Sequence, residues 1–396
     1  MRPFPRPPSQ SLVMADRALS GRLDDGTAKE RTRSGPGRLP SLTGLRFIAA
    51  GGVVYTHCAF LIHPHSVQTI GLHEWVGGSS VSLFFILSGY VLVHSARPTD
   101  TARGFWRRRA AKVLPNHVVT WSLMMVALAG AGAAAATSNA GLEAHLSSLF
   151  LVHSWIPSQR FVTAGNPVAW SLAAEMFFYL LFPVLQPWIE RLTLRGLLVG
   201  SGFALALVWT WPVLCEGIIN TRGAFFPEYW FLYVLPLTRL PEFVLGMMAA
   251  RISATGFRLP RIGVLPAALG VIGTIVVGDT CLPPRFMYAA ATAFPLVLLV
   301  YATAELDLRG RPSLLRTRPL VFLGEISYAI YLTHFLVLGS VNLAPKDHVS
   351  RVWVVVIGVP VVLLASWLLY VRVERPCVRR LSASRARTRA RAATTS

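Results

Sequence analysis

Residues 43–62 read TGLRFIAAGGVVYTHCAFLI, an apolar stretch that is long enough to cross a bilayer as one helix. The stretch nevertheless carries Arg46 and His57. Ionisable side chains are costly within hydrocarbon, and they usually have a function there. Because eleven positions correspond to about three helical turns, the two side chains lie on one face, roughly 16 Å apart along the axis. This spacing indicates a single elongated ligand that contacts both residues.

The composition of the whole chain predicts a membrane protein with many spans. Of its 396 residues, 53% are hydrophobic and only 14% are charged, and the mean hydropathy is +0.52. A soluble domain is not this apolar. We therefore predict an all-α fold, a polytopic transmembrane helical bundle of about ten spans, each about 20 residues long. The expected spans are residues 43–62, 77–95, 112–136, 167–188, 194–214, 229–250, 261–278, 285–304, 320–342 and 351–372.

The basic residues predict the orientation of this bundle. Lys and Arg gather in the loops that face the cytoplasm. Here 31 of the 38 fall in alternate connecting segments and at the two ends of the chain. We therefore expect a multi-pass cell-membrane protein with both termini in the cytoplasm. Its expected parts are a disordered basic tail (1–40), a transmembrane domain (41–378) and a disordered Arg-rich tail (379–396).

The charge and the cysteines exclude two classes of function. A net charge of +20 can indicate nucleic-acid binding, but here it is spread over loops and tails instead of one surface. We expect the lipid bilayer as a partner, and no nucleic acid. The four cysteines show no CxxC spacing and no Cys/His metal pattern, so we expect no metal site and no bound cofactor.

His57 and Glu175 are the candidate catalytic pair. His57 lies about five residues from the outer end of its span, and Glu175 about eight residues from the outer end of the span 167–188. The two side chains are therefore expected at a similar depth. A histidine can accept a proton from a hydroxyl, and a carboxylate beside it can orient the ring. The alternative is that each side chain only holds neighbouring helices together by a hydrogen bond.

The run WRRRAAK at 106–112 is a candidate phosphate site at the cytoplasmic start of the third span. Clustered Arg and Lys at a helix start bind phosphate through their charge and through free backbone N–H groups. Arg109 and Lys112 are closest to the span and are the better ligands, whereas Arg107 fits a purely topological role. Arg239 and Glu242 are three residues apart on one helix, so we predict a structural ion pair.

Seven motifs, taken together, resemble the acyltransferase 3 family of integral-membrane O-acyltransferases. They follow the expected order from residue 42 to residue 376, nearly the whole chain. The motifs are LTGLRFIAAGGVVYTH (42–57), SLFFILSGYVL (82–92), FWRRRAAKVLP (105–115), WSLAAEMFFYLLFP (170–183), LPEFVLGM (240–247), ISYAIYLTH (326–334) and VERP (373–376).

The resemblance implies a ten-helix enzyme that transfers an acyl group from cytoplasmic acyl-CoA, its co-substrate, to a hydroxyl. It implies that His57 is catalytic, directly as a base or through an acyl-histidine, with Glu175 as the family's acidic residue. Lys112 stands where Arg is usual, and His117 replaces a common aromatic residue. The residues expected to bind acyl-CoA are Arg46, Arg108, Arg109 and Lys112, and those expected to line the acceptor cavity are His334, Tyr331 and Trp170. For His334 the alternative is a hydrogen-bonded structural role.

The acceptor is expected to be a macrolide or a related secondary metabolite. Family members that modify envelope glycans often carry an extra soluble domain, which this sequence does not show, whereas members with a similar SLTGLRFIAA opening acylate macrolides. The acyl group would be acetyl, propionyl or a similar short chain. One alternative is O-acetylation of a cell-envelope polysaccharide or glycolipid. Another is a proton-coupled transporter, although the sequence shows no matching halves.

Overall fold

The computed structural model describes residues 37–62, 67–97, 100–130, 141–218, 225–257, 263–341 and 351–380. The chain divides into two units at Arg38, and the fold described here is that of the unit Leu39–Ser396. The predicted tails lie almost wholly outside the described residues. Within the described ranges every regular element is a helix, which confirms the predicted all-α class.

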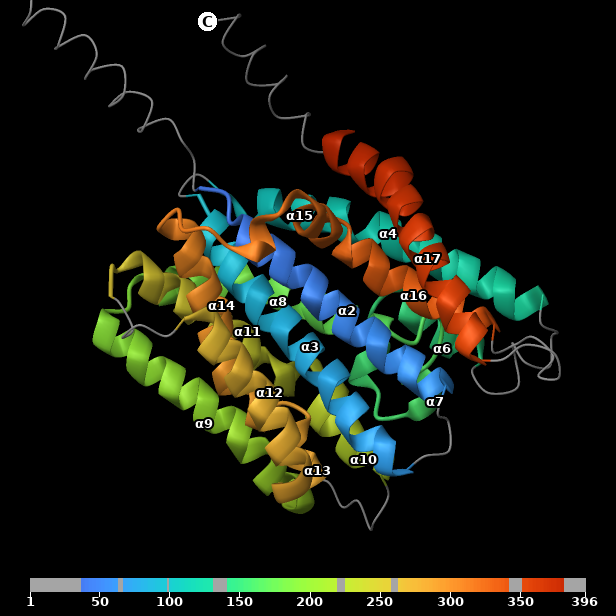
Figure 1. The fold of residues 1–396 in the computed structure, drawn as a ribbon, viewed down its shortest axis with the longest axis horizontal. Coiled ribbons are helices and arrows are strands. Elements are labelled where there is room, and N and C mark those ends of the chain that lie inside the picture. Colours follow the sequence, from blue (N-terminus) through green and yellow to red (C-terminus); the bar gives the residue numbers. More distant parts are fainter. Residues whose placement is uncertain are drawn as a thin grey trace, which may run out of the picture. The chain divides into compact units, whose positions relative to one another are not determined.

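Nine helices of the described ranges are long and apolar enough to cross a membrane by length and composition, and a bent pair makes ten. This count confirms the prediction of about ten spans. The helices are shown in Figure 1. They are α2 (Pro40–Ile62), α3 (Val67–Ser95), α4 (Ala102–Gly130), α8 (Ala169–Glu190), α9 (Leu194–Ile218), α10 (Phe225–Tyr229) continuing into α11 (Pro236–Ala254), α12 (Val264–Cys281), α13 (Pro284–Met287) with α14 (Ala290–Leu308), the bent pair α15 (Arg318–Glu325) and α16 (Ser327–Val341), and α17 (Arg351–Leu369). Between α4 and α8 lie the short helices α6 (Leu142–Leu149) and α7 (Gln159–Val162).

Helix α3 lies at the centre of the bundle, between α2 and α11 (Figure 1). The backbones of α3 and α11 approach closely because each has a glycine at the crossing. A Cβ atom on Gly89 would lie 2.0 Å from the carbonyl oxygen of Phe243, and one on Gly246 would lie 2.0 Å from that of Ile86. Small residues at such crossings are the usual means by which membrane helices pack.

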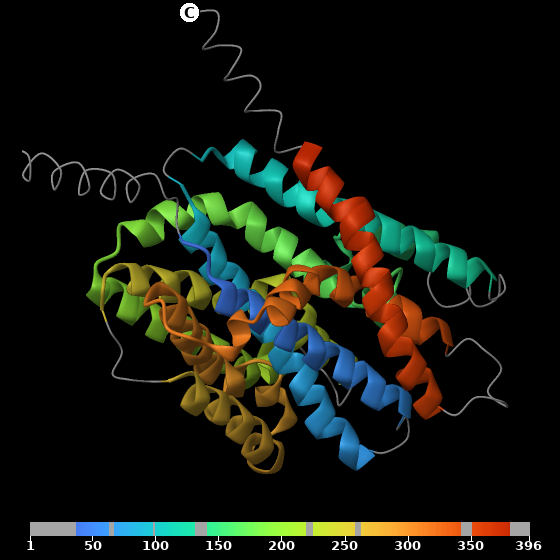
Figure 2. The ribbon, with the colours of Figure 1, turned by 45° about the horizontal axis from the view of Figure 1, so that its top comes forward.

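Burial separates inner helices from outer ones. In the most apolar window of each helix, 67% of residues are buried in α3, compared with 22% in α9 and in α12. Large apolar side chains such as Phe203 and Leu265 are exposed on these outer helices. Exposed apolar faces of this kind suit contact with lipid. Figure 2 shows that the helical segment continuing α17, which includes the π-helical turn Tyr370–Glu374, crosses α4 on another flank of the bundle.

Two spans are interrupted, which the sequence analysis did not predict. The expected span 229–250 has a π-helical turn at Trp230–Val234 and a break at Leu235, the residue before Pro236. The expected span 320–342 bends by 65° between α15 and α16. Interrupted helices are tolerated in membranes where protein groups satisfy the freed backbone.

The break before α11 is stabilised by Arg239, which forms the predicted ion pair with Glu242. Arg239 and Glu242 are fully buried, with 2.5 Å between Nε and Oε2, which confirms that prediction. The guanidinium group also donates to the carbonyl oxygen of Tyr233 at 3.1 Å and to Ser82 Oγ at 2.8 Å. Arg239 therefore satisfies backbone that the interruption leaves free and ties α11 to α3.

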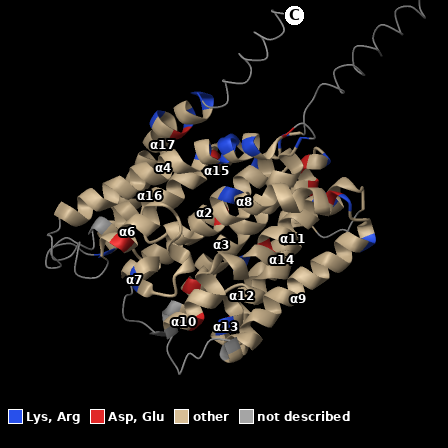
Figure 3. Cartoon of the chain, turned by 180° about the vertical axis from the view of Figure 1, so that it is seen from behind, with Lys and Arg blue, Asp and Glu red and all other residues tan. Residues whose placement is uncertain are grey.

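Charged side chains are unevenly distributed along the helices. Figure 3 shows most Lys and Arg at the end where α2 and α9 begin and α17 ends, which we call the basic end. Arg160 and Arg285 lie at the opposite end, in α7 and α13. This asymmetry agrees with the charge pattern from which the cytoplasmic side was predicted.

Candidate active site

One face of α8 lines three cavities that follow one another through the bundle. The spacings along this face are four, seven and four residues, which keep side chains on one side of a helix. The residues are Ser171, Glu175, Phe182 and Gln186. Gln186 and Phe182 line a cavity at the basic end, and Glu175 lines a small middle cavity. The third cavity, at the opposite end, begins one residue before Ser171, at Trp170.

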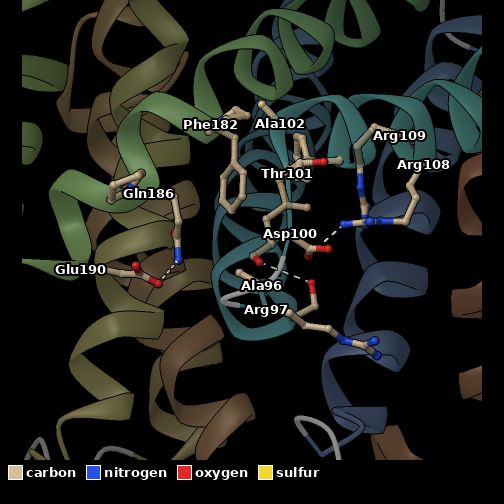
Figure 4. A pocket seen from close by; sticks show the side chains of 15 residues that line it. Ala96, Arg97, Asp100, Thr101, Ala102, Arg108, Arg109, Phe182, Gln186 and Glu190 are labelled. Atoms are coloured by element: carbon tan, nitrogen blue, oxygen red, sulfur yellow. Dashed lines mark hydrogen bonds and ion pairs between the residues drawn. The ribbon is translucent and has the colours of Figure 1, made fainter. Parts of the chain in front are cut away.

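The cavity at the basic end has a volume of about 460 Å³ and contains the predicted arginines (Figure 4). Arg108 forms an ion pair of 2.9 Å with Asp100. Arg109 has no ion-pair partner among the described residues, and its Nε is buried without a hydrogen bond. Its guanidinium carbon lies 5.7 Å from the ring centroid of Phe105 and 5.9 Å from that of Tyr179. Arg109 is thus held by aromatic rings while its charge is not neutralised.

The structure corrects the expected phosphate site in two respects. Helix α4 begins at Ala102, ten residues before the predicted start, so Arg109 lies two turns inside it. Its neighbouring backbone N–H groups are used within the helix and are not free to bind an anion. Lys112 does not line the cavity; it lies in electrostatic range of Arg46 and Glu374 instead. Glu374 also accepts a 2.7 Å hydrogen bond from Asn116.

The middle cavity is small, with a volume of about 40 Å³, and its wall is largely apolar, with Val81, Phe84, Phe85 and Leu172 among its residues. Arg46 and Glu175 both line it, together with Ser171, Tyr328 and Tyr331. Glu175 accepts hydrogen bonds from Ser88 Oγ, at 2.7 Å, and from the hydroxyl of Tyr179. A space of this size holds only a few water molecules or a thin chain.

The cavity at the opposite end is larger, at about 320 Å³, and contains His57. It shares Tyr331 and Val81 with the middle cavity, so the two adjoin. Trp170 and Tyr331, which the sequence analysis assigned to an acceptor cavity, both line it. Its wall is rich in aromatic side chains, and it also contains Glu74, which the sequence analysis did not single out. The further aromatic residues of the wall are Phe60, Phe226, Tyr229 and Tyr233.

His334 lies behind His57 and does not line this cavity, so of its two expected roles the structure favours the hydrogen-bonded one. It is fully buried, and its Nε2 is 3.4 Å from Nδ1 of His57. In each ring Nδ1 lies within hydrogen-bond distance of the carbonyl oxygen four residues earlier. For His57 this is the oxygen of Val53, at 2.9 Å, and for His334 it is the oxygen of Ile330, at 3.2 Å.

These contacts determine the tautomers of both rings. A carbonyl oxygen can only accept, so Nδ1 carries the hydrogen in each neutral histidine. The Nδ1–H of His57 donates to Val53, and Nε2 of His334 lies 3.4 Å from the same nitrogen as a second, longer contact. Nε2 of His57 is left with a lone pair that can accept a proton from a molecule in the cavity.

Glu175 is not the residue that orients His57. Its hydrogen bonds go to Ser88 and Tyr179, and the described hydrogen bonds of His57 go to Val53 and His334. The two candidate catalytic residues line adjoining cavities instead of forming a pair. Sequence reasoning missed the pairing of histidines because α2 and α16 are far apart in the chain. The only available signal was that both histidines were expected in the outer halves of their spans.

Comparison with known proteins defines the family. The model of the acyltransferase domain, acyltransferase 3, matches residues 39–371. The chain belongs to the acyltransferase 3 family. This membership confirms the resemblance inferred from the seven motifs, and it makes the protein an acyltransferase with many membrane helices. No solved structure matches the chain.

Several relatives are similar to this family member over most of its length. Acyltransferase MdmB of Streptomyces mycarofaciens is 35% identical over 88% of this chain and 94% of its own. The exopolysaccharide production protein ExoZ of Rhizobium meliloti (strain 1021) is 29% identical over 81% of this chain and 96% of its own. A putative O-acetyltransferase of Staphylococcus aureus (strain COL) is 23% identical over 85% of this chain but only 57% of its own.

Proposed function

We propose that this acyltransferase moves a short acyl group from acyl-CoA, taken up at the cytoplasmic face, to a hydroxyl of a macrolide or related secondary metabolite. The observation that carries the proposal is the alignment of three cavities. An arginine without an anionic partner lies in the first, Arg46 in the second and His57 in the third.

The donor would lie along this line of cavities. Arg109 and Arg108 would hold the phosphates of the nucleotide, since guanidinium groups bind phosphate through paired N–H donors. The cavity of about 460 Å³ has the size of a small-molecule site. The thin pantetheine arm would pass Arg46 and Glu175 in the narrow middle cavity and present its thioester near His57.

His57 would act as a general base in the transfer. Nε2 takes the proton from the acceptor hydroxyl while the oxygen attacks the thioester carbonyl carbon. A carbon–oxygen bond forms, the carbon–sulfur bond breaks, and the proton passes to the departing thiolate, so that the products are an ester and free CoA. In the alternative route the acyl group rests first on His57 and then moves to the acceptor.

Two observations favour a secondary metabolite as the acceptor. The relative MdmB comes from a Streptomyces species and matches over 94% of its own length. The wall of the cavity is aromatic, which suits an apolar ring system better than a strongly hydrated glycan. The similarity to ExoZ keeps O-acylation of an exopolysaccharide as the second candidate.

The test is mass spectrometry of acceptor products. Membranes containing the wild-type protein or His57→Ala are incubated with acetyl-, propionyl- or isovaleryl-CoA and with macrolides or glycans. We expect the mass of one acyl group to be added to a macrolide by the wild type only. Acylation of glycans alone would overturn the proposed acceptor. Release of CoA in step with acceptor acylation would distinguish the enzyme from a proton-coupled transporter, and no release with any acceptor would favour transport.

A further inference from the structure

Glu74 is an unexplained charge in the cavity of His57. It lies in α3, half-buried, one turn before Gly77 and Gly78, which line the same cavity. Its carboxylate has no hydrogen bond or ion pair among the described residues. A half-buried carboxylate is unfavourable unless a donor or a cation pairs with it. The group that pairs with Glu74 is therefore expected to come from the ligand.

Three aromatic side chains that line the same cavity as Glu74 are in contact with one another. The ring centroids of Trp170 and Tyr233 are 4.6 Å apart, and those of Tyr229 and Tyr233 are 5.2 Å apart. Tyr229 and Tyr233 both lie in electrostatic range of Glu74. Aromatic faces attract cations, and several faces beside a carboxylate form the usual site for an alkylated ammonium group.

Arg239, a buried cation beside these rings, does not fill this role. The guanidinium carbon of Arg239 lies 5.0 Å from the ring centroid of Tyr233, but Arg239 is paired with Glu242 and does not line the cavity. Its charge is therefore already neutralised. Glu74 remains the negative group of the cavity that can balance a positive charge on a bound molecule.

The distance between Glu74 and His57 is constrained by the packing of α2 on α3. Thr56 Oγ1 donates a 2.7 Å hydrogen bond to the carbonyl oxygen of His73. The next residues in the two helices are His57 and Glu74. A Cβ atom on Gly77 would lie 2.7 Å from Thr56 Oγ1, so the helices touch at this level. The base and the carboxylate therefore belong to one rigid wall.

We propose that this cavity recognises acceptors that carry an alkylated, protonated or quaternary amine, which is bound by Glu74 and the faces of Trp170, Tyr229 and Tyr233. The inference rests on the proposed function and specifies its acceptor class: a molecule with a cationic amine at one point and the acylated hydroxyl at another. The amine would lie at Glu74 while the hydroxyl lies at His57.

The test uses two probes of the same shape. Choline and 3,3-dimethylbutan-1-ol both carry a primary hydroxyl and differ mainly in a positive nitrogen in place of a carbon. Binding of each to the purified full-length protein in detergent is measured by tryptophan fluorescence without acyl-CoA. We expect choline to bind about tenfold more tightly than the neutral alcohol. Glu74→Gln should bring the ratio of the two affinities close to one. Tyr229→Leu should lower the affinity for choline and leave the affinity for the alcohol unchanged.

Glu228→Gln is the matched control, because it removes a carboxylate of α10 that does not line the cavity. It should leave the ratio unchanged. Equal binding of the two probes to the wild type, or an unchanged ratio in a folded Glu74→Gln protein, would overturn the inference. The binding ratio is measured without transfer, so it stays decisive even if no macrolide is acylated. Acylation of macrolides with an unchanged ratio would refute the ammonium site alone.

Discussion

Nε2 of His334 lies 3.4 Å from Nδ1 of His57, although the two residues are 277 positions apart in the chain. The contact joins α16 to α2 directly behind the cavity in which transfer is proposed. The Nδ1–H of His57 donates to the carbonyl oxygen of Val53, and the ring of His334 packs against the same side of His57, so both contacts leave Nε2 of His57 for the cavity. We therefore expect His334, as a neutral histidine, to have the orienting function that a carboxylate has in other catalytic groups.

Loss of His334 is expected to slow transfer without weakening the binding of acyl-CoA. His334→Leu should lower kcat by about 10- to 100-fold, the range typical of residues that orient a functional histidine. KM for acyl-CoA should stay within about twofold, because His334 lines none of the three cavities. His334→Gln, which keeps an acceptor oxygen, should recover part of kcat. A rise in KM of the same size as the fall in kcat would contradict the positioning role.

Removal of the proposed base is expected to have the largest effect on chemistry. His57→Ala should reduce kcat by at least about 100-fold, the usual effect of losing a general base. The variant should still bind acyl-CoA, because Arg108 and Arg109 lie in a different cavity. Equilibrium binding of a non-hydrolysable acyl-CoA analogue and melting in detergent provide the controls. Retained transfer in a folded His57→Ala protein would exclude both catalytic routes.

Arg109 is expected to act only on the nucleotide portion of the donor. Arg109→Ala should raise KM for acetyl-CoA by about tenfold or more, since charge-assisted phosphate contacts contribute about 1.5–3 kcal/mol. With acetyl-pantetheine, which lacks the nucleotide, wild type and variant should be equally slow. Arg107→Ala is the control, because its side chain does not line the cavity. An equal effect of Arg109→Ala on both donors would show that the arginine acts on the acyl group or on folding.

The crossing of α3 and α11 is expected to tolerate no added methyl group. Gly89→Ala or Gly246→Ala would place a Cβ atom 2.0 Å from a carbonyl oxygen of the other helix. Because that oxygen belongs to the backbone, no rotation of a side chain can relieve the clash. Overpacking of this kind costs about 1–3 kcal/mol. Thermal melting in detergent should therefore fall by several degrees for either variant. Gly51→Ala in α2, where nothing lies within 4 Å, should melt at or above the wild-type temperature.

Some parts of the site followed from local sequence. The apolar length of residues 43–62 predicted α2, and the helical period placed Arg46 and His57 on one face. Both residues do line the aligned cavities. The pairing of Arg239 with Glu242 was likewise predictable, because three positions within one helix bring two side chains together whatever the rest of the fold does.

Other expectations failed because local patterns say nothing about partners on distant helices. Glu175 has the depth expected of a partner for His57, yet α8 presents it to α3, where Ser88 binds it. Lys112 follows Arg109 by one turn, yet its side chain lies near Glu374, more than 250 positions later. The early start of α4 was hidden because its first turns are charged and therefore not apolar enough to be read as part of a span.

The sequence by itself determined the family, the helical class and the number of spans, since the length and apolarity of each segment are set by the thickness of the bilayer. It also indicated which residues are candidates for chemistry, because charged groups in hydrocarbon are rare enough to be noticed. Only the tertiary structure decided which of these groups meet. The packing of α2 against α3 and α16 places His334 behind His57 and Glu74 beside it, and such contacts depend on the relative rotation of whole helices, which no local pattern specifies.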